Sequence, residues 1–574
     1  MYILGISCFY HDSSATLLKD GKIVAAAHEE RFTRVKHDNS FPINAINYCL
    51  TSQNIGINGI RYIGFYEKPL LKFERVLYQH LEMFPRSFKT FLLSLPSWIN
   101  EKLRVIKIIK KKLKYKGDVL FVEHHLAHAA NAFLVSPFKE AAIVTMDGVG
   151  EWTTTAYGYG KNNSIELYKE LRFPNSIGLL YSAITAYLGF KVNDSEYKIM
   201  GLSAYGNKDK EKNIFYRKLK QVIDVKNDGS FKLDMDYFAY HYSGRMFSKK
   251  LCKLLGLPRK PGSELMQKHK DIAAALQMIT EKVAIKILNH VNKETKSKNI
   301  VLGGGVALNS VLNGKILKST AFNNIWISPD PGDGGTSLGV ASYIYFTILG
   351  KKRNYILRNI YLGSEFSSSE IKFFLENNKI KYSKFRNSKE LINKTAKLIF
   401  QNFIVGWFQL GMEFGPRALG ARSILANPCN IKMKQILNIN IKHREEFLPF
   451  APSICEDDVL EYFDCDKPIP ESTNFMLMVY PIKKKWHKKI PAVVHLDGSG
   501  RLQAVKRSSN PLYYDLIKEF GKLSNIPILI NTSFNLSGEP IVCTPNDAYK
   551  CMINSGIDYL VIDKFLIRRE DNTV

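Results

Sequence analysis

The amino-acid sequence predicts an α/β protein whose N-terminal part is internally duplicated. A series of short apolar runs separated by turn residues opens the chain, and a similar series returns near residue 141. Further along, between residues 299 and 335, glycine-rich turns follow apolar runs and precede helical patterns. Alternation of strand and helix patterns is typical of α/β folds. With 574 residues, the chain is also long enough for two or more domains.

The two repeats share the order strand, acidic turn, strand, turn, strand. Asp12 lies in the acidic turn of the first repeat and Asp147 in that of the second. Such self-similarity implies a duplicated α/β unit. Two units of this kind, facing each other across a cleft, describe the architecture shared by actin, Hsp70 and the sugar kinases. The expected strands span residues 2–7, 15–18 and 23–27 in the first repeat and 141–145, 153–159 and 165–171 in the second.

Glycines in the middle of the chain indicate one wall of a nucleotide cleft. We expect a helix at 271–291, a strand at 299–302 and another helix at 307–317, with glycines at 303–305 between the last two. Glycines between a strand and a helix N-terminus let backbone amides approach a phosphate or ribose. Gly304 is therefore a candidate nucleotide-binding residue, although three glycines also make an ordinary turn.

A basic, weakly patterned stretch at 350–359 is the best linker candidate and predicts a domain boundary near residue 355. We expect one domain over 1–354 and a second over 355–574. The second domain should contain strands at 404–408 and 527–530.

Composition favours a globular protein of the cytoplasm. Hydrophobic residues make up 45% of the chain and charged residues 23%, which is ordinary. No apolar run approaches the roughly 18 residues of a membrane span, and no basic n-region of a secretory signal is visible. The eight cysteines are scattered without a Cys-x-x-Cys pair, which argues against a disulfide framework and a thiolate metal site.

The formal net charge of +28, from 81 basic and 53 acidic residues, is compatible with nucleic acid, a membrane surface or anionic substrates as partners. The densest block, residues 101–116, has eight basic residues among Leu103, Ile106, Ile109 and Leu113. It predicts an amphipathic basic helix. Its alternative interpretation is a solvated helix face in a lysine-rich protein, and we expect no specific nucleic-acid partner.

Two histidines four residues apart, His124 and His128, are candidate metal ligands. The run at 126–133 is rich in helix formers, and residues i and i+4 share one face of a helix. Asp333, in a glycine-rich turn, is a candidate carboxylate ligand. Two imidazoles and a carboxylate suit iron(II) or zinc with open coordination positions. The alternative is two incidental histidines, and no glutamate follows His124 as the zincin motif of metalloproteases requires.

A second group of polar residues is spread over the C-terminal part. Fixed cations with amide and hydroxyl donors suit a phosphate-bearing substrate, although single surface arginines more often pair with local carboxylates. The group comprises Arg417, Arg422, Lys442, His443, Arg444, Arg501, Asn531 and Ser533.

The chain resembles the carbamoyltransferase family of nodulation-factor, aminoglycoside and cephalosporin biosynthesis. The matching motifs keep the family's order over nearly the whole chain. They lie at residues 11–15, 29–34, 124–130, 147–151, 198–202, 304–309, 415–420, 531–535 and 538–542.

This resemblance implies an actin-like domain followed by a YrdC-like α/β domain, marked by Lys442-x-Arg444 and Ser533-x-Asn535. It implies that the YrdC-like domain uses carbamoyl phosphate and ATP, the latter with magnesium, to form carbamoyl-adenylate. The actin-like domain, with a divalent metal that is iron(II) in relatives, would transfer the carbamoyl group to a hydroxyl of a small metabolite or saccharide. A shielded site is needed because water destroys such a mixed anhydride.

The resemblance also implies roles for individual residues. His124, His128 and Asp333 match metal ligands. Asp147, Asp12 and His11 are the catalytic candidates, and either carboxylate could act as general base. The positions around the adenylate are Lys36, Asp147, Lys198, Gly304 and Asn309. The positions around carbamoyl phosphate are Arg417, Lys442, Arg444, Arg501, Asn531 and Ser533.

Leu448 departs from the family, which usually has a phosphate-binding arginine there; His443, Arg444 or Arg422 could compensate. Acceptor contacts are expected in segments 60–120 and 205–270, which match the family least. A homodimer is a possible assembly. Two alternatives remain: a threonylcarbamoyl-type tRNA-modifying enzyme, and a non-catalytic nucleotide-binding scaffold or sugar-kinase-like regulator.

Overall fold

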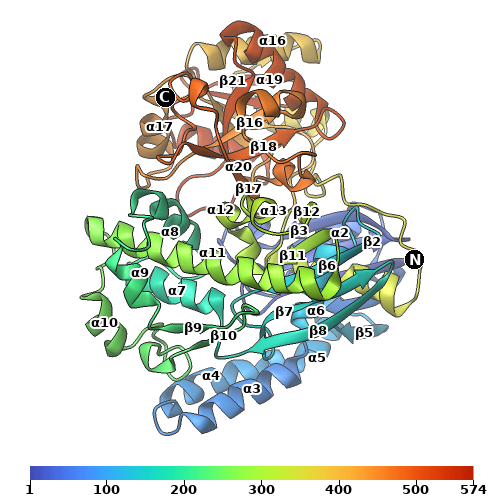
Figure 1. The fold of residues 1–574 in the computed structure, drawn as a ribbon. Coiled ribbons are helices and arrows are strands. Elements are labelled where there is room, and N and C mark those ends of the chain that lie inside the picture. Colours follow the sequence, from blue (N-terminus) through green and yellow to red (C-terminus); the bar gives the residue numbers. More distant parts are fainter. Residues whose placement is uncertain (573–574) are drawn as a thin grey trace. The chain divides into compact units, whose positions relative to one another are not determined.

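The computed structural model of the chain describes residues 1–572 (Figure 1). The chain divides into two compact units. The N-terminal unit comprises Met1–Ala25 and Asn39–Leu357, and the C-terminal unit comprises Ala26–Asp38 and Arg358–Val574. The short segment Ala26–Asp38 thus leaves the N-terminal unit, joins the C-terminal one and returns, which the sequence patterns do not predict.

The segment Ala26–Asp38 is held within the C-terminal unit by its arginines. Arg31 donates to the backbone oxygen of Gly415 at 3.0 Å, and Arg34 donates to those of Pro540 and Ile541 at 2.8 and 2.7 Å. Carbonyl oxygens far along the chain therefore anchor this N-terminal segment.

The N-terminal unit contains two five-stranded sheets with the same topology. Their strand orders are β3-β2-β1-β4-β5 and β8-β7-β6-β11-β12. In the first sheet, β1 is antiparallel to β2 and parallel to β4, which is parallel to β5. In the second sheet, β6 is antiparallel to β7 and parallel to β11, which is parallel to β12. The first sheet consists of β1 (Tyr2–Ser7), β2 (Ser14–Lys19), β3 (Lys22–His28), β4 (Ile60–Phe65) and β5 (Asp118–Phe121). The second consists of β6 (Glu140–Met146), β7 (Thr153–Lys161), β8 (Ser164–Arg172), β11 (Asn299–Gly303) and β12 (Asn324–Ile327).

This repeated topology confirms the predicted duplicated, actin-like and sugar-kinase-like fold. Two buried helices lie between the sheets. Helix α14 (Thr336–Tyr343) packs on β1, β2 and β4, whereas α6 (His124–Phe133) packs on β6, β7, β8 and β11. The two helices also pack on each other. An added Cβ at Gly339 would lie 2.0 Å from the backbone oxygen of Ala127, so glycine is needed where α14 crosses α6.

The predicted elements around the central glycines differ in detail. The expected helix at 271–291 is α11, which is longer (Gln267–Thr295). The helix expected at 307–317 is instead three short pieces: a 3-10 turn (Gly305–Leu308), α12 (Ser310–Asn313) and α13 (Ile316–Ser319). The side chain of Asn309 caps α12 by accepting from the backbone N–H of Leu312, and this polar cap starts a new helix.

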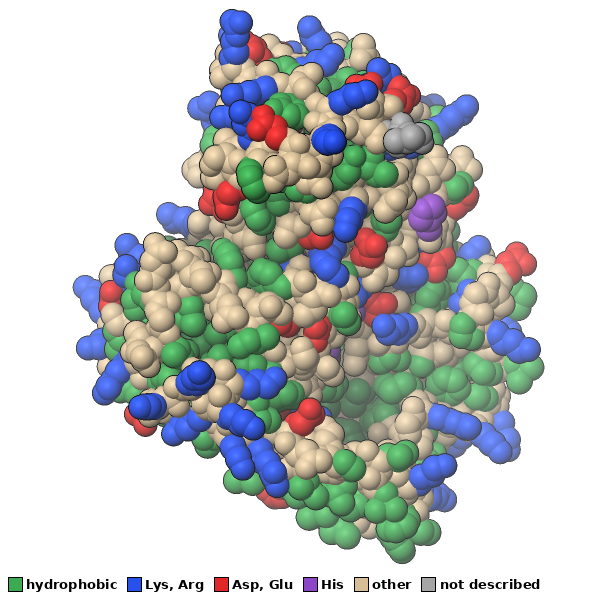
Figure 2. Space-filling model, turned by 180° about the vertical axis from the view of Figure 1, so that it is seen from behind, with side chains coloured by type: hydrophobic (Ala, Val, Ile, Leu, Met, Phe, Trp, Pro, Cys, Tyr) green, Lys and Arg blue, Asp and Glu red, His purple; other side chains and the backbone are tan. Residues whose placement is uncertain are grey.

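Helices outside the two sheets come mainly from two stretches of the chain. The first stretch contains α2 (Ile43–Thr51), α3 (Pro69–Glu82), α4 (Phe88–Asn100) and α5 (Val105–Leu113), whereas α1 (Glu30–Thr33) belongs to the C-terminal unit. The second contains α7 (Ile177–Tyr187), α8 (Glu196–Leu202), α9 (Ile214–Leu219), α10 (Lys249–Leu255) and the hairpin of β9 (Ile223–Val225) and β10 (Phe231–Leu233). Hydrophobic side chains gather at the lower end of the face in Figure 2, where α3 and α4 lie in Figure 1.

The C-terminal unit is built on a mixed nine-stranded sheet of order β13-β21-β20-β14-β15-β19-β16-β18-β17. Helices α16 (Ser388–Phe400) and α19 (Pro511–Ser524) bury leucine, isoleucine and aromatic side chains against its central strands. The other helices are α15 (Ser368–Asn377), α17 (Met433–Ile436), α18 (Val459–Tyr462) and α20 (Pro545–Ile553). The strands are β13 (Ser383–Lys384), β14 (Val405–Phe408), β15 (Arg422–Ala426), β16 (Ala451–Cys455), β17 (Met478–Pro481), β18 (Ser499–Val505), β19 (Ile528–Ser533), β20 (Tyr559–Ile562) and β21 (Phe565–Arg568).

Within residues 1–572, every helix is too short or too polar to cross a membrane. All eight cysteines lie in this range and no disulfide joins any of them, as the sequence predicts.

Candidate active site

The two candidate metal-binding histidines lie at the start of helix α6. His124 is its first residue, and the carboxylate of Glu151 accepts the backbone N–H of His124, with both oxygens at 3.1 Å. A carboxylate at this position satisfies a free N–H and stabilises the positive end of the helix dipole. Glu151 is buried and comes from the turn after β6, so it ties the histidine helix to the acidic turn.

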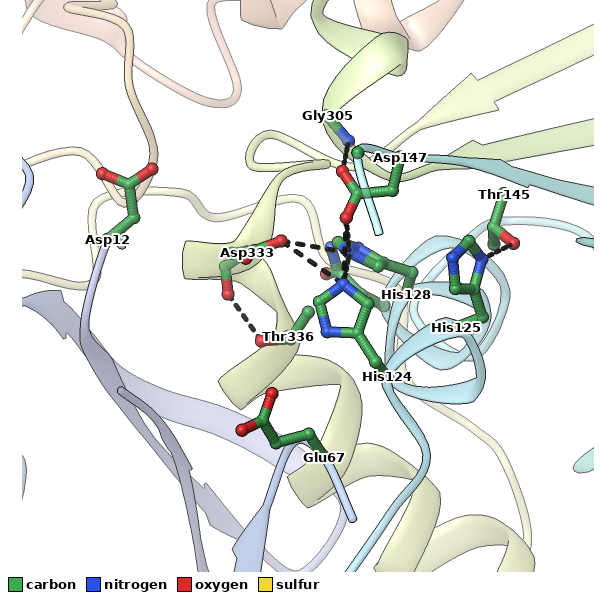
Figure 3. A network of polar contacts seen from close by, with 12 residues as sticks. Asp12, Glu67, His124, His125, His128, Thr145, Asp147, Gly305, Asp333 and Thr336 are labelled. Atoms are coloured by element: carbon green, nitrogen blue, oxygen red, sulfur yellow. Dashed lines mark hydrogen bonds and ion pairs between the residues drawn. The ribbon is translucent and has the colours of Figure 1, made fainter. Parts of the chain in front are cut away.

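Four side chains converge in the interior of the N-terminal unit (Figure 3). Nε2 of His128 lies 3.1 Å from Nε2 of His124, and Nε2 of His124 lies 3.0 Å from Oδ2 of Asp147. Oδ1 of Asp333 lies 3.3 Å from Nε2 of His128 and 3.6 Å from Nε2 of His124. One ligand atom from each of the four residues lies within 4.8 Å of the others. The structure thus brings the three predicted ligands together and adds Asp147.

The two carboxylates reach the histidines from two different parts of the N-terminal unit. Asp147 follows β6, and its Oδ1 accepts the N–H of Gly305 at 2.9 Å. Asp333 begins the turn that leads into α14, which packs on α6. The close packing of these helices therefore places Asp333 beside His128.

The negative charges of Asp147 and Asp333 favour a cation at this cluster, either a proton on a histidine or a metal ion. Burial alone would raise the pKa of Asp147, but hydrogen bonds from His124 and His128 outweigh it and hold the pKa well below its usual range. Burial lowers the pKa of His128, whereas Asp147 and Asp333 raise it, and the result is about 9. A metal ion would have to displace this proton, because imidazole binds metals in its neutral form.

The donor set fits a divalent ion. The buried carboxylate of Asp333 lies 3.3 Å from His128 and 3.6 Å from His11, but these contacts lack hydrogen-bond geometry. A buried carboxylate with lone pairs left over can bind a further cation. Two imidazole nitrogens bound to one ion at ~2.1 Å lie about 3.0–3.4 Å apart, depending on the coordination angle. The 3.1 Å between His124 and His128 falls in this interval.

His125, between the two histidines in sequence, has a different role. Its Nδ1 lies 2.7 Å from the hydroxyl of Thr145 on β6. Burial, followed by the charges of His124 and His128, lowers the pKa of His125 to about 3, so its ring is neutral. His125 is a packing residue of the helix rather than a member of the cluster.

His11 and Asp12 lie beside the cluster. Nδ1 of His11 is 2.9 Å from Oδ2 of Asp12, and Nε2 of His11 is 3.6 Å from Oδ2 of Asp333. His11 therefore connects Asp12 to the cluster, while the carboxylate of Asp12 itself points elsewhere (Figure 3). Asp12 has a φ of 53°, a left-handed conformation that aspartate tolerates better than most residues.

A buried polar group from helix α3 lies on another side of the cluster. Lys72 donates to Glu67 at 2.5 Å, and its Nζ lies 4.8 Å from the ring centre of Tyr10. The guanidinium of Arg75 lies 5.0 Å from the ring centre of Phe173, and its buried Nε has no hydrogen-bond partner among the described residues. Both cations lie in segment 60–120, in which the sequence analysis expects acceptor contacts.

The predicted nucleotide-binding residues of the N-terminal unit have separate local roles. Gly304 has a φ of 86°, and an added Cβ would lie 2.2 Å from the backbone oxygen of Met146, so only glycine fits this turn. Asn309 and Gln277 exchange two amide hydrogen bonds of 2.9 and 3.1 Å. Nζ of Lys198 on α8 lies 5.6 Å from the ring centre of Phe190. These hydrogen bonds of Asn309 thus attach α12 to α11.

Lys442 is the centre of a polar group in the C-terminal unit. Its buried Nζ donates to the backbone oxygen and hydroxyl of Ser533, and to the backbone oxygen and Oδ1 of Asn535 at 3.0 and 2.8 Å. Burial, followed by the charge of Arg444 and then that of Lys36, lowers the pKa of Lys442 to about 7. Lys36, predicted to face an adenylate, therefore lies close to Lys442 within this unit.

Arg444 and Leu448 lie on the loop that follows Lys442. Arg444 donates to Oδ1 of Asn438 at 2.8 Å, and its guanidinium lies 4.8 Å from the ring centre of Phe450. Leu448, at the position where the sequence analysis expects an arginine in the family, exposes only 2% of its surface. The loop is therefore packed around an apolar side chain at this position.

Arg422, a candidate to replace that arginine, has a structural role instead. Its guanidinium is fully buried and donates to the backbone oxygens of Gln409, Leu410 and Ser364 at 2.7, 3.1 and 2.7 Å. Each of these hydrogen bonds uses a guanidinium N–H that could otherwise contact a phosphate. Compensation by Arg422 for the absent arginine stays a prediction.

The remaining cations and amides lie on neighbouring strands and loops. Asn531 on β19 is buried and donates to Oε1 of Gln503 at 2.7 Å, which leaves its own Oδ1 without a hydrogen bond among the described residues. Glu413, which the sequence analysis overlooked, accepts the N–H groups of Leu419, Ala421 and Arg422 and so shapes the loop that contains Arg417.

Comparison with known proteins assigns both halves of the chain. Residues 2–342 match the carbamoyltransferase N-terminus and residues 396–569 the carbamoyltransferase C-terminus. A Synechocystis protein designated sll1178 is 43% identical over 99% of this chain and 97% of its own length. The nodulation protein NolNO of Sinorhizobium fredii is 32% identical over 98% of this chain and 79% of its own. The nodulation protein NolO of Bradyrhizobium diazoefficiens is 33% identical over 78% of this chain and 79% of its own length.

Proposed function

Because the chain belongs to the carbamoyltransferase family, we propose that it uses ATP and carbamoyl phosphate to carbamoylate a hydroxyl of a small metabolite or saccharide. The observation that carries this proposal is the convergence of His124, His128, Asp147 and Asp333 in the N-terminal unit. The polar group around Lys442 in the C-terminal unit supports a separate phosphate-handling step.

In the first step, carbamoyl phosphate loses its phosphate to water, and the resulting carbamate attacks the α-phosphorus of ATP. Carbamoyl-adenylate forms and pyrophosphate leaves. Lys442 and Arg444 would offset the charge of the phosphate groups, and Ser533 and Asn531 would orient them through hydrogen bonds. Burial of Lys442 strengthens its attraction to a dianion, because few waters compete there.

In the second step, the acceptor hydroxyl attacks the carbamoyl carbon and AMP leaves. A bound divalent ion, for which we propose iron(II), would supply Lewis-acid polarisation of the carbamoyl oxygen. His124, His128, Asp147 and Asp333 would hold that ion. Asp12, which lies 2.9 Å from His11, would accept the proton of the hydroxyl.

The acceptor would approach the cluster from the side of helix α3. Lys72 and Arg75 of this helix are buried, and Tyr10, over whose ring Lys72 lies, directly precedes His11. An unsatisfied guanidinium at such a place favours an acceptor with an anionic or strongly hydrogen-bonding group.

The nature of the nucleotide product tests the proposal. With ATP and carbamoyl phosphate but no acceptor, we expect AMP and pyrophosphate, and neither should form when carbamoyl phosphate is omitted. Lys442→Ala should abolish both products, whereas Lys488→Ala, at an exposed lysine of the same unit, should leave them unchanged. Formation of ADP instead of AMP would reject adenylation and indicate a kinase.

A further inference from the structure

The hairpin of helices α3 and α4 has an apolar surface that the described residues leave uncovered. Among residues 1–572, ten of the 24 exposed large hydrophobic side chains lie within residues 70–99, and each exposes between 37% and 74% of its surface. Single exposed apolar side chains are normal on a protein, but a gathering of this kind marks an interaction site.

The exposed residues of α3 follow helical spacing. Leu70, Leu77 and Leu81 are seven and four residues apart, so they form one stripe along the helix. Lys72 and Arg75, which face the interior, lie on the opposite side. The helix therefore buries its lysine and arginine and exposes these leucines, while Glu74 and Glu82 also lie at the surface.

Helix α4 repeats this arrangement. Phe88, Leu92 and Ile99 are exposed on one stripe, and Trp98 is the buried residue of the helix. At the turn between the helices, the rings of Phe84 and Phe88 are 6.0 Å apart, so the two stripes meet there. Figure 2 shows hydrophobic side chains gathered at the bottom of the view, on the N-terminal unit.

Basic residues are concentrated in the turn after α3, in α4 and in α5. Residues 84–116 contain ten basic residues and one acidic residue. On α5, Val105, Ile109 and Leu113 are buried, which turns Lys107 and Lys110 to solvent. Neither these lysines nor the adjacent Lys111 form an ion pair within residues 1–572.

We propose that α3, α4 and α5 bind the surface of an anionic lipid bilayer. Leucine and phenylalanine side chains would enter the boundary between headgroups and acyl chains, while the lysines of α5 would contact anionic headgroups. A second copy of this chain is a poorer occupant. A two-fold interface would bring the same basic segments of two chains together, and like charges repel.

The test measures binding of the full chain to vesicles of phosphatidylcholine alone and of three parts phosphatidylcholine to one part phosphatidylglycerol. We expect cosedimentation with the second kind only, weakening as salt is raised. The triple variant Leu81→Ser, Phe84→Ser, Leu93→Ser and the triple variant Lys107→Gln, Lys110→Gln, Lys111→Gln should each reduce the partition coefficient by about tenfold or more. All six positions are exposed, so both variants should fold.

The matched control is Leu257→Ser, Phe373→Ser, Ile431→Ser, at three exposed positions elsewhere in the chain. It should bind vesicles as the wild type does. Absence of wild-type binding, or equal loss in the control, would overturn the proposal. Light scattering that shows a dimer disrupted by the serine variant, without vesicle binding by the wild type, would overturn it in favour of a second copy.

Discussion

Nε2 of His124 and Nε2 of His128 face each other at 3.1 Å in the interior of the N-terminal unit. Two neutral imidazoles gain little from this approach unless they share a proton or a metal ion. The nearby carboxylates of Asp147 and Asp333 supply the negative charge that either cation requires. Substitution of this pair therefore tests whether the two proposed half-reactions use separate sites.

The double substitution His124→Ala, His128→Ala should stop carbamoylation of an acceptor while pyrophosphate release continues. Loss of two of four ligands leaves too few to hold a divalent ion, and the phosphate-handling residues lie in the other unit. Pyrophosphate and carbamoylated product are measured in the same reaction. Iron(II) should restore activity to chelator-treated wild type but not to the variant.

His125→Gln is the matched control, because His125 is on the same helix and faces Thr145 instead. It should keep the bound metal. Loss of both activities in a folded double variant would contradict the assignment of transfer to this cluster alone.

Binding of carbamoyl phosphate should take up a proton at pH 8 but not at pH 6. The pKa of Lys442 is lowered to about 7, so the lysine is mostly neutral at pH 8 in the free protein and mostly charged at pH 6. A bound dianion favours the charged form and raises this pKa. Calorimetry in buffers of different ionisation enthalpy counts the protons.

The affinity for carbamoyl phosphate should accordingly fall as the pH rises above 7. Lys442→Met should lose the proton uptake and this pH dependence together. Uptake that persists in the variant would assign the proton to another group.

Leu448→Arg should destabilise the C-terminal unit rather than improve substrate binding. Leu448 is 2% exposed, and a buried unpaired charge costs about 2–5 kcal/mol of the free energy of unfolding. Urea denaturation compares it with Ile431→Arg, at an exposed position of the same unit. A stable Leu448→Arg variant with a lower KM for carbamoyl phosphate would show that this side chain reaches the substrate.

Arg75→Ala should raise the KM for the acceptor without changing acceptor-independent pyrophosphate release. Loss of one charge-assisted hydrogen bond weakens binding by about ten- to a hundredfold. Arg75→Lys should recover only part of the affinity, because lysine lacks the planar fork of donors. An unchanged KM with reduced thermal stability would leave Arg75 with a packing role against Phe173.

Binding to tRNA should be micromolar or weaker and should fall steeply between low and physiological salt, as counterion release requires. Lys and Arg side chains are spread over the face shown in Figure 2. Electrophoretic titration at several salt concentrations measures this. Salt-resistant binding that discriminates among tRNAs would favour a threonylcarbamoyl-type activity.

Features that depend on neighbouring residues could be predicted from the sequence. The spacing of His124 and His128 places both rings on one face of any helix, and the structure confirms that helix as α6. The two repeats of apolar runs predict six strands and the duplicated fold. A strand can be predicted in this way because its burial follows the pattern of apolar and polar residues at consecutive positions. The candidate phosphate-binding residues were proposed through family resemblance and stay a prediction.

Features that join distant residues were decided only by the tertiary structure. Asp147 joins Asp333 in the cluster, and Glu151 caps the histidine helix, because β6, α6 and α14 pack together. The tertiary structure alone also determines which backbone oxygens accept hydrogen bonds from Arg422, and that Ala26–Asp38 belongs to the C-terminal unit. A helix sets the relative positions of residues four apart through its own backbone hydrogen bonds. The positions of residues some two hundred apart depend instead on close packing between elements, which no local pattern in the chain encodes.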